Sequence, residues 1–120
     1  MADGVYTDLN GDKSVRKIVY TLTTADPNGS AIPAHDFQHK SIQADGTFGA
    51  ATVVLDGSND GTNFYPLANS AAAAIGLTVA GLATNVSTVQ FVRPRLSVVG
   101  IGATIVVCIV MHAPANRFAQ

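Results

Sequence analysis

Hydrophobic and polar positions alternate in short runs along the chain, and each run ends at a cluster of turn-forming residues. Residues 15–24 form the first run, which stops at the Asp-Pro-Asn-Gly sequence of residues 26–29. Proline fixes φ at such a site and glycine permits positive φ. Two more runs, residues 36–43 and 50–55, follow, and the second returns as residues 63–67 across a loop rich in Asp, Asn and Gly. This pattern predicts strands, with a hairpin between the last two runs.

The second half of the chain continues in the same way. Residues 88–95 read as a strand, in which Pro94 must lie at an edge, a bulge or an unpaired side. Residues 96–99 and 103–112 predict a last hairpin, and the alanine-rich residues 70–74 could form one helical turn. Because about seven or eight short strands occur without an amphipathic helix, we predict an all-β protein with a single antiparallel, jelly-roll-like β-sandwich.

Two parts of the chain are distinguished by their apolar content. Residues 1–14 contain turn formers and few apolar side chains, so we expect an extended N-terminal arm that is ordered only by contact with a neighbour. Residues 15–120 then form the sandwich domain. The size of the chain, 120 residues, fits one such domain.

Residues 104–111 (TIVVCIVM) are apolar on both alternating faces. A half-exposed antiparallel strand should be apolar on one face only. Either this strand lies centrally with both faces covered inside the domain, or its outer face, with Val106 and Val110, meets another subunit. Both alternatives fit the pattern equally well.

The low charge of the chain favours the second of these alternatives, contact with another subunit. Only 12% of the residues are charged, all eight acidic residues are aspartate, and the formal net charge is −1, whereas about 25% charged residues is usual. A near-neutral chain lacks the basic stripe that binds nucleic acid, so no nucleic-acid partner is expected. So few charges leave part of the exterior to be covered by neighbouring protein, which favours assembly.

No membrane or secretory segment is expected. Residues 96–111 are uncharged, but they are fewer than the roughly 20 residues that a spanning helix needs, and Gly100 and Gly102 interrupt them. The sequence opens on Met-Ala-Asp-Gly without an apolar run, which argues against a signal peptide. The single cysteine, Cys108, excludes an intrachain disulfide, and we expect synthesis in a reducing cytoplasm.

Asp56, Ser58 and Asp60, followed by Gly61, resemble the first half of an EF-hand calcium loop. The twelfth position, however, is Leu67 instead of a bidentate glutamate. An Asx-rich turn whose side chains bind their own backbone explains the sequence better. These three residues remain a weak candidate for a structural cation, and no metal or other cofactor is predicted.

Other candidate chemistry is no stronger. His35 and His39 have the spacing of a helical zinc motif, but on a strand they would lie roughly 13 Å apart. Cys108 stands in the most apolar run, where a thiol is normally inert. The sequence has no nucleophile elbow, dinucleotide-binding fingerprint or paired carboxylates. We therefore expect no catalytic residues and no enzyme.

Arg93 and Arg95 flank Pro94 and are the only close basic pair in the second half of the chain. Without interleaved aromatic residues they do not form a nucleic-acid site. Arginines in such a position make bidentate contacts to carboxylates or carbonyls, and they are favoured at interfaces. We predict that Arg93 and Arg95, like Val106 and Val110, contribute to an interface.

Residues 52–67 (TVVLDGSNDGTNFYPL) resemble a strand-loop-strand hairpin found in small structural proteins of tailed bacteriophages. Residues 90–96 (QFVRPRL), with the glycine turn and valine-rich strand after them, look like the second half of those domains. The resemblance covers residues 46–111. A similar hairpin occurs in discoidin-like carbohydrate-binding jelly rolls, where a tryptophan often replaces Phe64.

The resemblance implies a virion component, most simply a capsid decoration or cement protein. Such a protein would be made in the cytoplasm of the host bacterium and would lie on the capsid surface. Its partners would be the major capsid protein and further copies of itself, often as a homotrimer. The alternatives are a phage neck or tail protein, or a carbohydrate-binding module for host recognition, which would need an exposed aromatic ring with polar neighbours.

Overall fold

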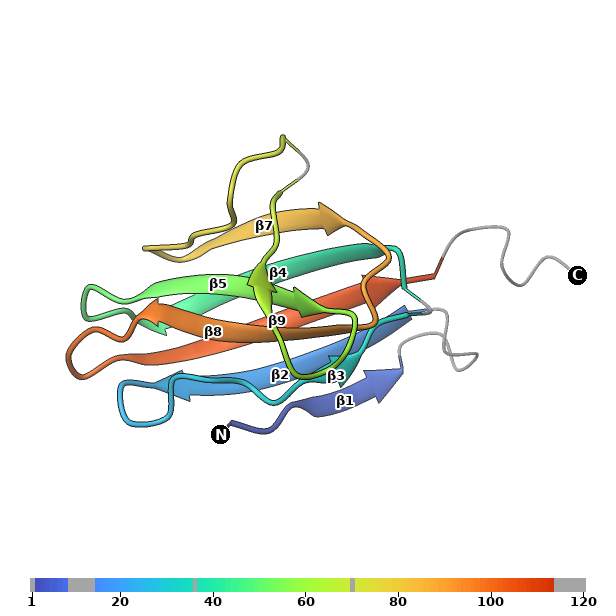
Figure 1. The fold of residues 1–120 in the computed structure, drawn as a ribbon. Helices are drawn as coiled ribbons and strands as arrows, with labels where there is room; N and C mark the ends of the chain where they lie inside the picture. Colours follow the sequence, from blue (N-terminus) through green and yellow to red (C-terminus); the bar gives the residue numbers. More distant parts are fainter. Residues whose placement is uncertain (1, 9–14, 36, 70, 114–120) are drawn as a thin grey trace, which may run out of the picture.

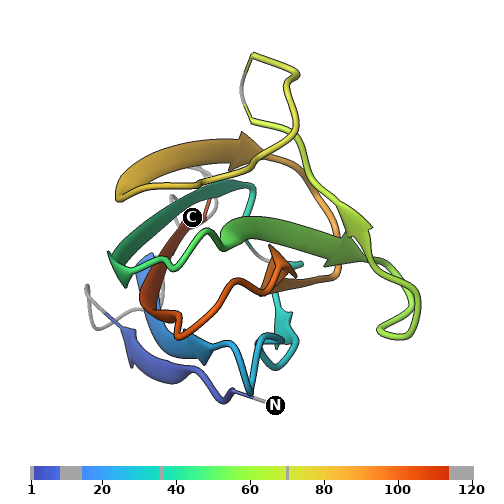
Figure 2. The ribbon, with the colours of Figure 1, turned by 90° about the vertical axis from the view of Figure 1, so that its left-hand side faces the viewer.

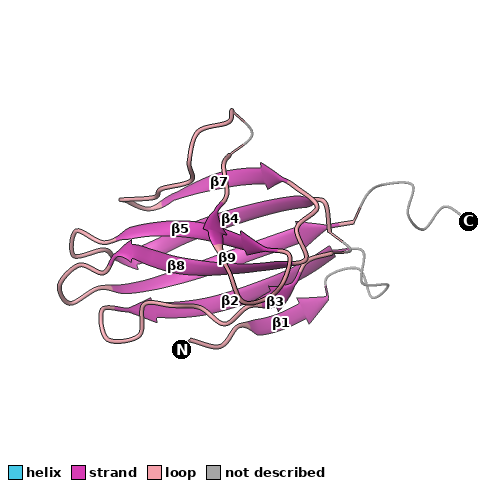
Figure 3. Ribbon diagram, viewed as in Figure 1, coloured by secondary structure: helices cyan, strands magenta, loops and turns pink. Residues whose placement is uncertain are grey.

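The computed structural model describes residues 2–8, 15–35, 37–69 and 71–113. These residues form two antiparallel sheets packed face to face, with no helix among them (Figures 1 and 3). The strand order is β1-β2-β9-β4-β7 in the larger sheet and β3-β8-β5-β6 in the smaller one. The predicted all-β sandwich is therefore confirmed. The strands are β1 Val5–Asp8, β2 Val15–Thr23, β3 Ile32–Pro33, β4 His39–Thr47, β5 Thr52–Ser58, β6 Tyr65–Pro66, β7 Gly81–Val86, β8 Phe91–Val98 and β9 Thr104–His112.

The core lies between the two sheets and follows the alternation of the strands. In β9 every second side chain, from Ile105 to Met111, is fully buried, and each such burial stabilises the fold by about 1.5–3 kcal/mol. The hydroxyl of Tyr20 donates a hydrogen bond of 2.9 Å to the carbonyl oxygen of Ser30, so its polar end is satisfied. The larger sheet contributes these buried side chains: Ile18, Tyr20, Leu22, Ile42, Ala44, Ile105, Val107, Ile109 and Met111.

The predicted last hairpin is wrong. β8 pairs with β3 and β5, whereas β9 pairs with β2 and β4, so residues 99–103 cross from one sheet to the other. Figure 2 shows this orange-to-red connection between the two layers. Gly100 and Gly102, with φ of 69° and 64°, adopt the left-handed conformation that glycine allows without strain. A glycine-rich turn thus serves a crossover here instead of a hairpin.

Several strand limits also differ from the prediction. β4 continues through Asp45 and Gly46 to Thr47, because its partner β9 extends over the same length. β7 was not predicted at all. No helical turn forms near residues 71–74, where Asn69 Oδ1 accepts hydrogen bonds from the backbone N–H groups of Ala71 and Ala73. Such a side-chain cap competes with helix formation.

Part of the predicted N-terminal arm belongs to the larger sheet. β1 pairs with β2 from Val5 opposite Val19 to Asp8 opposite Arg16. This segment therefore finds its hydrogen-bond partners within the same chain and needs no neighbour for them. Residues 9–14 lie outside the described residues, and the domain limit at residue 15 remains a prediction. None of the described segments forms a helix long and apolar enough to span a membrane.

Candidate functional site

The outward surface of the larger sheet, which we call the outer face, is the largest candidate site. β9 lies at the centre of this sheet, between β2 and β4. Its outward side chain Val106 is 46% exposed, whereas the inward side chains are fully buried. The first alternative, that both faces of this strand are covered inside the domain, is therefore wrong. The apolar side chains of the outer face point to solvent.

The strand register shows which side chains share this face. Val5, Val19, Cys108, Gln43 and Leu82 form one cross-strand row over all five strands. Neighbouring rows have a similar composition, and only two of the described side chains are Lys, Arg, Asp or Glu. The outer face comprises Val5, Val15, Lys17, Val19, Thr21, Thr23, His39, Ser41, Gln43, Asp45, Thr47, Leu82, Thr84, Val86, Thr104, Val106, Cys108, Val110 and His112.

Cys108 is partly exposed at the centre of the outer face. It lines an open hollow of about 370 Å³ together with Gln43, Asp45, Gly46 and Val106. The alternation of β9 explains this position, because the other set of side chains fills the core.

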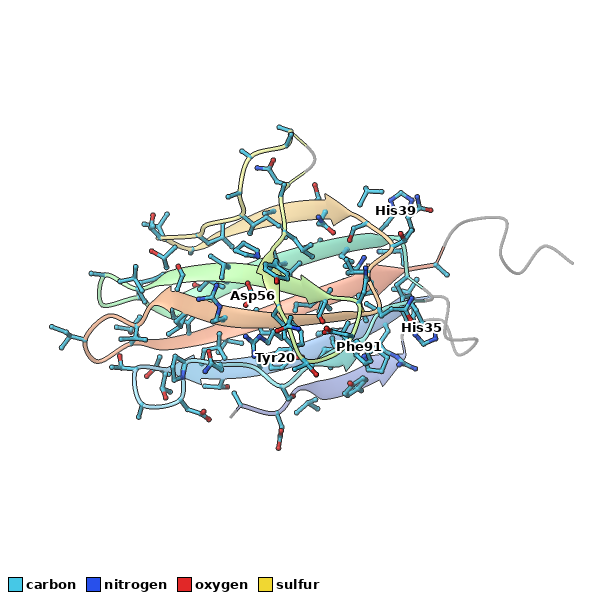
Figure 4. All side chains as sticks on the ribbon, viewed as in Figure 1. Tyr20, His35, His39, Asp56 and Phe91 are labelled. Atoms are coloured by element: carbon cyan, nitrogen blue, oxygen red, sulfur yellow. The ribbon has the colours of Figure 1, made fainter. Side chains whose placement is uncertain are left out.

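The smaller sheet contains a buried ion cluster around Asp56, which is labelled in Figure 4. The Asp56 side chain is 1% exposed. Arg95 binds it through two contacts, Nε to Oδ2 at 2.6 Å and the terminal Nη2 to Oδ1 at 3.2 Å. Arg93 Nε lies 3.5 Å from the same carboxylate, and its guanidinium stacks on the ring of Phe64 at 4.2 Å.

Arg95 makes the bidentate contact to a carboxylate that was predicted for the arginine pair, whereas Arg93 does not. Hydrogen bonding to Asp56 raises the pKa of Arg95 above its already high ordinary value. The contacts within the chain satisfy the guanidinium of Arg95 but leave the buried Nε of Arg93 without a hydrogen bond among the described residues. An interface role for Arg93 and Arg95 stays a prediction.

The candidate cation loop has the contacts of an Asx-rich turn. Asp60 Oδ1 accepts hydrogen bonds from the Ser58 hydroxyl and from the backbone N–H groups of Thr62 and Asn63, at 2.8–2.9 Å. The backbone bonds from Asn63 and Thr62 lower the pKa of Asp60 well below its ordinary value. Asp56 is bound to Arg95, so the oxygens that a cation would need are engaged. Among the described residues, no group of three or more His, Cys, Asp or Glu side chains could hold a metal ion.

An exposed aromatic ring lies beside this loop. The Tyr65 side chain is 69% exposed and lines an open hollow of about 350 Å³ with Asn59, Asp60, Asn63 and Pro66 among its neighbours. Tyr65 belongs to the two-residue edge strand β6. In the sequence, only its position in the hairpin, next to Phe64, indicates that Tyr65 could be an exposed binding residue.

A buried polar network links β4 to β7 and was not predicted. Lys40 is 2% exposed, and its Nζ donates to the carbonyl oxygen and the hydroxyl of Ser87 at 2.8 and 3.2 Å. Ser87 donates to Asn85 Oδ1 at 2.7 Å, and Asn85 Nδ2 donates to the carbonyl oxygen of Ala68 at 2.6 Å. Burial lowers the pKa of Lys40 to about 8. Lys40 alternates with Ile42 and Ala44 along the strand, and this pattern could have predicted that the lysine side chain faces the core.

His35 and His39 are both exposed and do not lie on a helix, as expected from the sequence. His35 lies in a turn, and His39 begins β4 on the outer face; the two are apart in Figure 4. Directly opposite His39 in the register of β4 and β9 stands His112. The fold therefore brings together two histidines from distant parts of the chain.

Comparison with known proteins identifies similar folds but does not assign the chain to a family. No protein-family model matches the chain, and no curated protein matches it. The solved structure of the SPBc2 prophage-derived protein YomS is similar over 81% of this chain and 94% of its own length, with a TM-score of 0.59 and 13% identity. The PBSX exported protein XepA is similar over 82% of this chain and 38% of its own length, with a TM-score of 0.61 and 13% identity. The chain thus has a β-sandwich fold that these two proteins share.

Proposed function

We propose that the chain is a structural protein of a bacteriophage virion that docks through its outer face. The most specific form of this proposal is a capsid decoration protein that binds the shell of major capsid protein and stabilises it as an oligomer. The observation that carries it is the outer face itself, on which Val5, Leu82, Val86 and Val106 are 46–68% exposed. Exposed apolar surface of this extent marks an interaction site.

The outer face is large enough for a specific interface. Its three central strands have nine residues each. The edge strands β1 and β7 have four and six residues. With a rise of about 3.3 Å per residue and a strand spacing of about 4.8 Å, the five strands cover roughly 600 Å². Standard interfaces bury about 600–1,000 Å² on each partner, so one partner laid flat on this sheet would form a contact at the lower end of that range.

The polar side chains of the outer face suit a contact that excludes water. Thr21, Ser41, Gln43 and Thr84 can donate and accept hydrogen bonds without the desolvation cost of a full charge. Lys17 and Asp45 lie on different strands, β2 and β4. A depletion of charged residues at the centre is characteristic of protein interfaces. The prophage origin of YomS agrees with a phage source for this fold.

Binding to capsids tests the proposal. The purified chain is added to emptied capsids of the cognate phage, and the melting temperature of the shell is measured with and without it. We expect co-sedimentation with the capsids and a higher melting temperature. Val106→Asp should abolish both effects, whereas Val79→Asp, a matched change of a 70% exposed valine outside the outer face, should preserve them. A monomeric chain that ignores capsids contradicts the proposal.

A carbohydrate-binding module is the second candidate, and Tyr65 is the observation that favours it. Sugar rings stack on exposed aromatic faces and are oriented by a few polar groups. The hollow beside Tyr65 offers Asn59 and Asn63 for such contacts. Screening on a glycan array tests this function, with Tyr65→Ala as the variant that should lose binding. Binding that survives this substitution would exclude the hollow as a glycan site.

A further inference from the structure

The facing histidines of β4 and β9 form a potential metal chelate. His39 and His112 are direct cross-strand partners, and both side chains belong to the outer face. Both are exposed, and both line one open hollow of about 310 Å³. Neither imidazole makes a hydrogen bond or an ion pair to a described residue, so their ring nitrogens remain available to a ligand.

The sheet geometry sets the distance between the two rings. Directly opposite residues on one face of an antiparallel pair have Cβ atoms about 4.5–5.5 Å apart. A transition-metal ion binds imidazole nitrogen at about 2.0–2.1 Å. Two rings that project from the same face at this spacing can lean toward one ion without a change in the backbone. The ladder between β4 and β9 continues from this pair as far as Thr47 opposite Thr104, so the pair is held by a regular sheet.

We infer that His39 and His112 together bind a divalent transition metal as a bidentate chelate at the end of the outer face. Imidazole suits Zn²⁺, Ni²⁺ and Cu²⁺, whereas Mg²⁺ and Ca²⁺ prefer oxygen ligands. On the flanking strands the two histidines face Val15 and Val86, which add no oxygen donors. The donor set therefore selects the nitrogen-binding metals.

Two protein ligands leave the other positions of the ion open. Zinc usually takes four ligands, and no third His, Cys, Asp or Glu of the described residues joins the pair. Water or donors from a second molecule complete the coordination. The site does not depend on the virion function, since it is a property of the isolated chain.

Titration of the untagged full chain with Ni²⁺ and Zn²⁺ tests the inference. Calorimetry should show one ion bound per chain, and Mg²⁺ should give no heat of binding. His39→Gln and His112→Gln should each weaken binding by about 100-fold, because the second nitrogen of a chelate binds at a high effective concentration. The third histidine of the chain provides the control, and His35→Gln should bind as the unmodified protein does. Absence of binding in the unmodified chain overturns the inference.

The imidazole signals give a second readout that does not depend on the variants. Paramagnetic Ni²⁺ should broaden the proton resonances of His39 and His112 at substoichiometric concentration and leave those of His35 sharp. Equal broadening of all three histidines, or equal weakening by all three substitutions, would show nonspecific binding and would overturn the inference. Thermal melts of each variant check that the fold is kept.

Discussion

The buried Lys40 makes a sharp prediction about stability as a function of pH. Its ammonium group donates hydrogen bonds to Ser87, but no ion pair with a described carboxylate compensates its burial. Substitution by methionine, Lys40→Met, keeps an unbranched side chain of similar length and removes the titrating group. Because the substitution also removes the two hydrogen bonds to Ser87, the pH dependence of the difference, rather than its size at one pH, reports on the charge.

The size of the effect follows from the pKa of Lys40. Burial lowers this pKa from 10.5 to about 8 in the folded chain, and each pKa unit corresponds to about 1.4 kcal/mol. Between pH 8 and 10.5 the unfolded chain binds more protons than the folded chain, so the free energy of unfolding rises with pH. The rise reaches about 3 kcal/mol. Below pH 8 the lysine is charged in both states, and the full cost of its burial is present.

Urea unfolding at pH 7, 8, 9 and 10, followed by circular dichroism, measures this rise. The difference in free energy of unfolding between the unmodified chain and Lys40→Met should change by about 2 kcal/mol over this range. Taking the difference removes the contribution of titrating groups that the substitution does not affect. Lys17→Met, on the outer face, serves as the matched control for the loss of a lysine side chain. Parallel curves for the unmodified chain and Lys40→Met would refute the role assigned to burial.

Two further predictions concern the ion cluster and the crossover loop. Asp56→Ala removes the carboxylate between two arginines and should cost about 3 kcal/mol of unfolding free energy by urea unfolding; a cost no larger than that of the exposed Asp45→Ala would argue against the cluster. Gly100→Ala should destabilise the chain more than Gly102→Ala, because a Cβ at Gly100 would meet the carbonyl oxygen of Gly49 at 2.6 Å, while one at Gly102 would meet nothing within 4 Å. Equal losses of melting temperature would contradict this difference.

Hydrophobic alternation predicted most of the strands but not their assignment to sheets. The strong patterns of β2 and β9 predicted both ends of each strand to within one residue of the observed limits. β7 escaped notice because its inward side chains are Ala83 and Asn85, whereas Leu82 and Val86 face outward. The crossover after β8 resembled a hairpin because glycines at positive φ serve both kinds of connection.

The sequence predicted only those features of the candidate sites that depend on the pattern of a single strand. The apolar outer side of β9 was visible in the sequence, and so was the tendency of the arginine pair to bind a carboxylate. The pairing of His39 with His112 depends on the register of two strands far apart in the chain, which no local pattern encodes. The burial of Lys40 likewise depends on Ser87 and Asn85, which lie on or beside β7.

Protection of Cys108 tests most directly whether the outer face is the docking surface. This single cysteine lies at the centre of the face and is partly exposed, so a small maleimide reagent should label it in the free chain. Labelling should slow at least about tenfold when the chain is bound to capsids, while a cysteine placed at residue 79 in a Cys108→Ser chain should react equally fast free and bound. Unchanged labelling of Cys108 in the capsid-bound chain would contradict docking through the outer face.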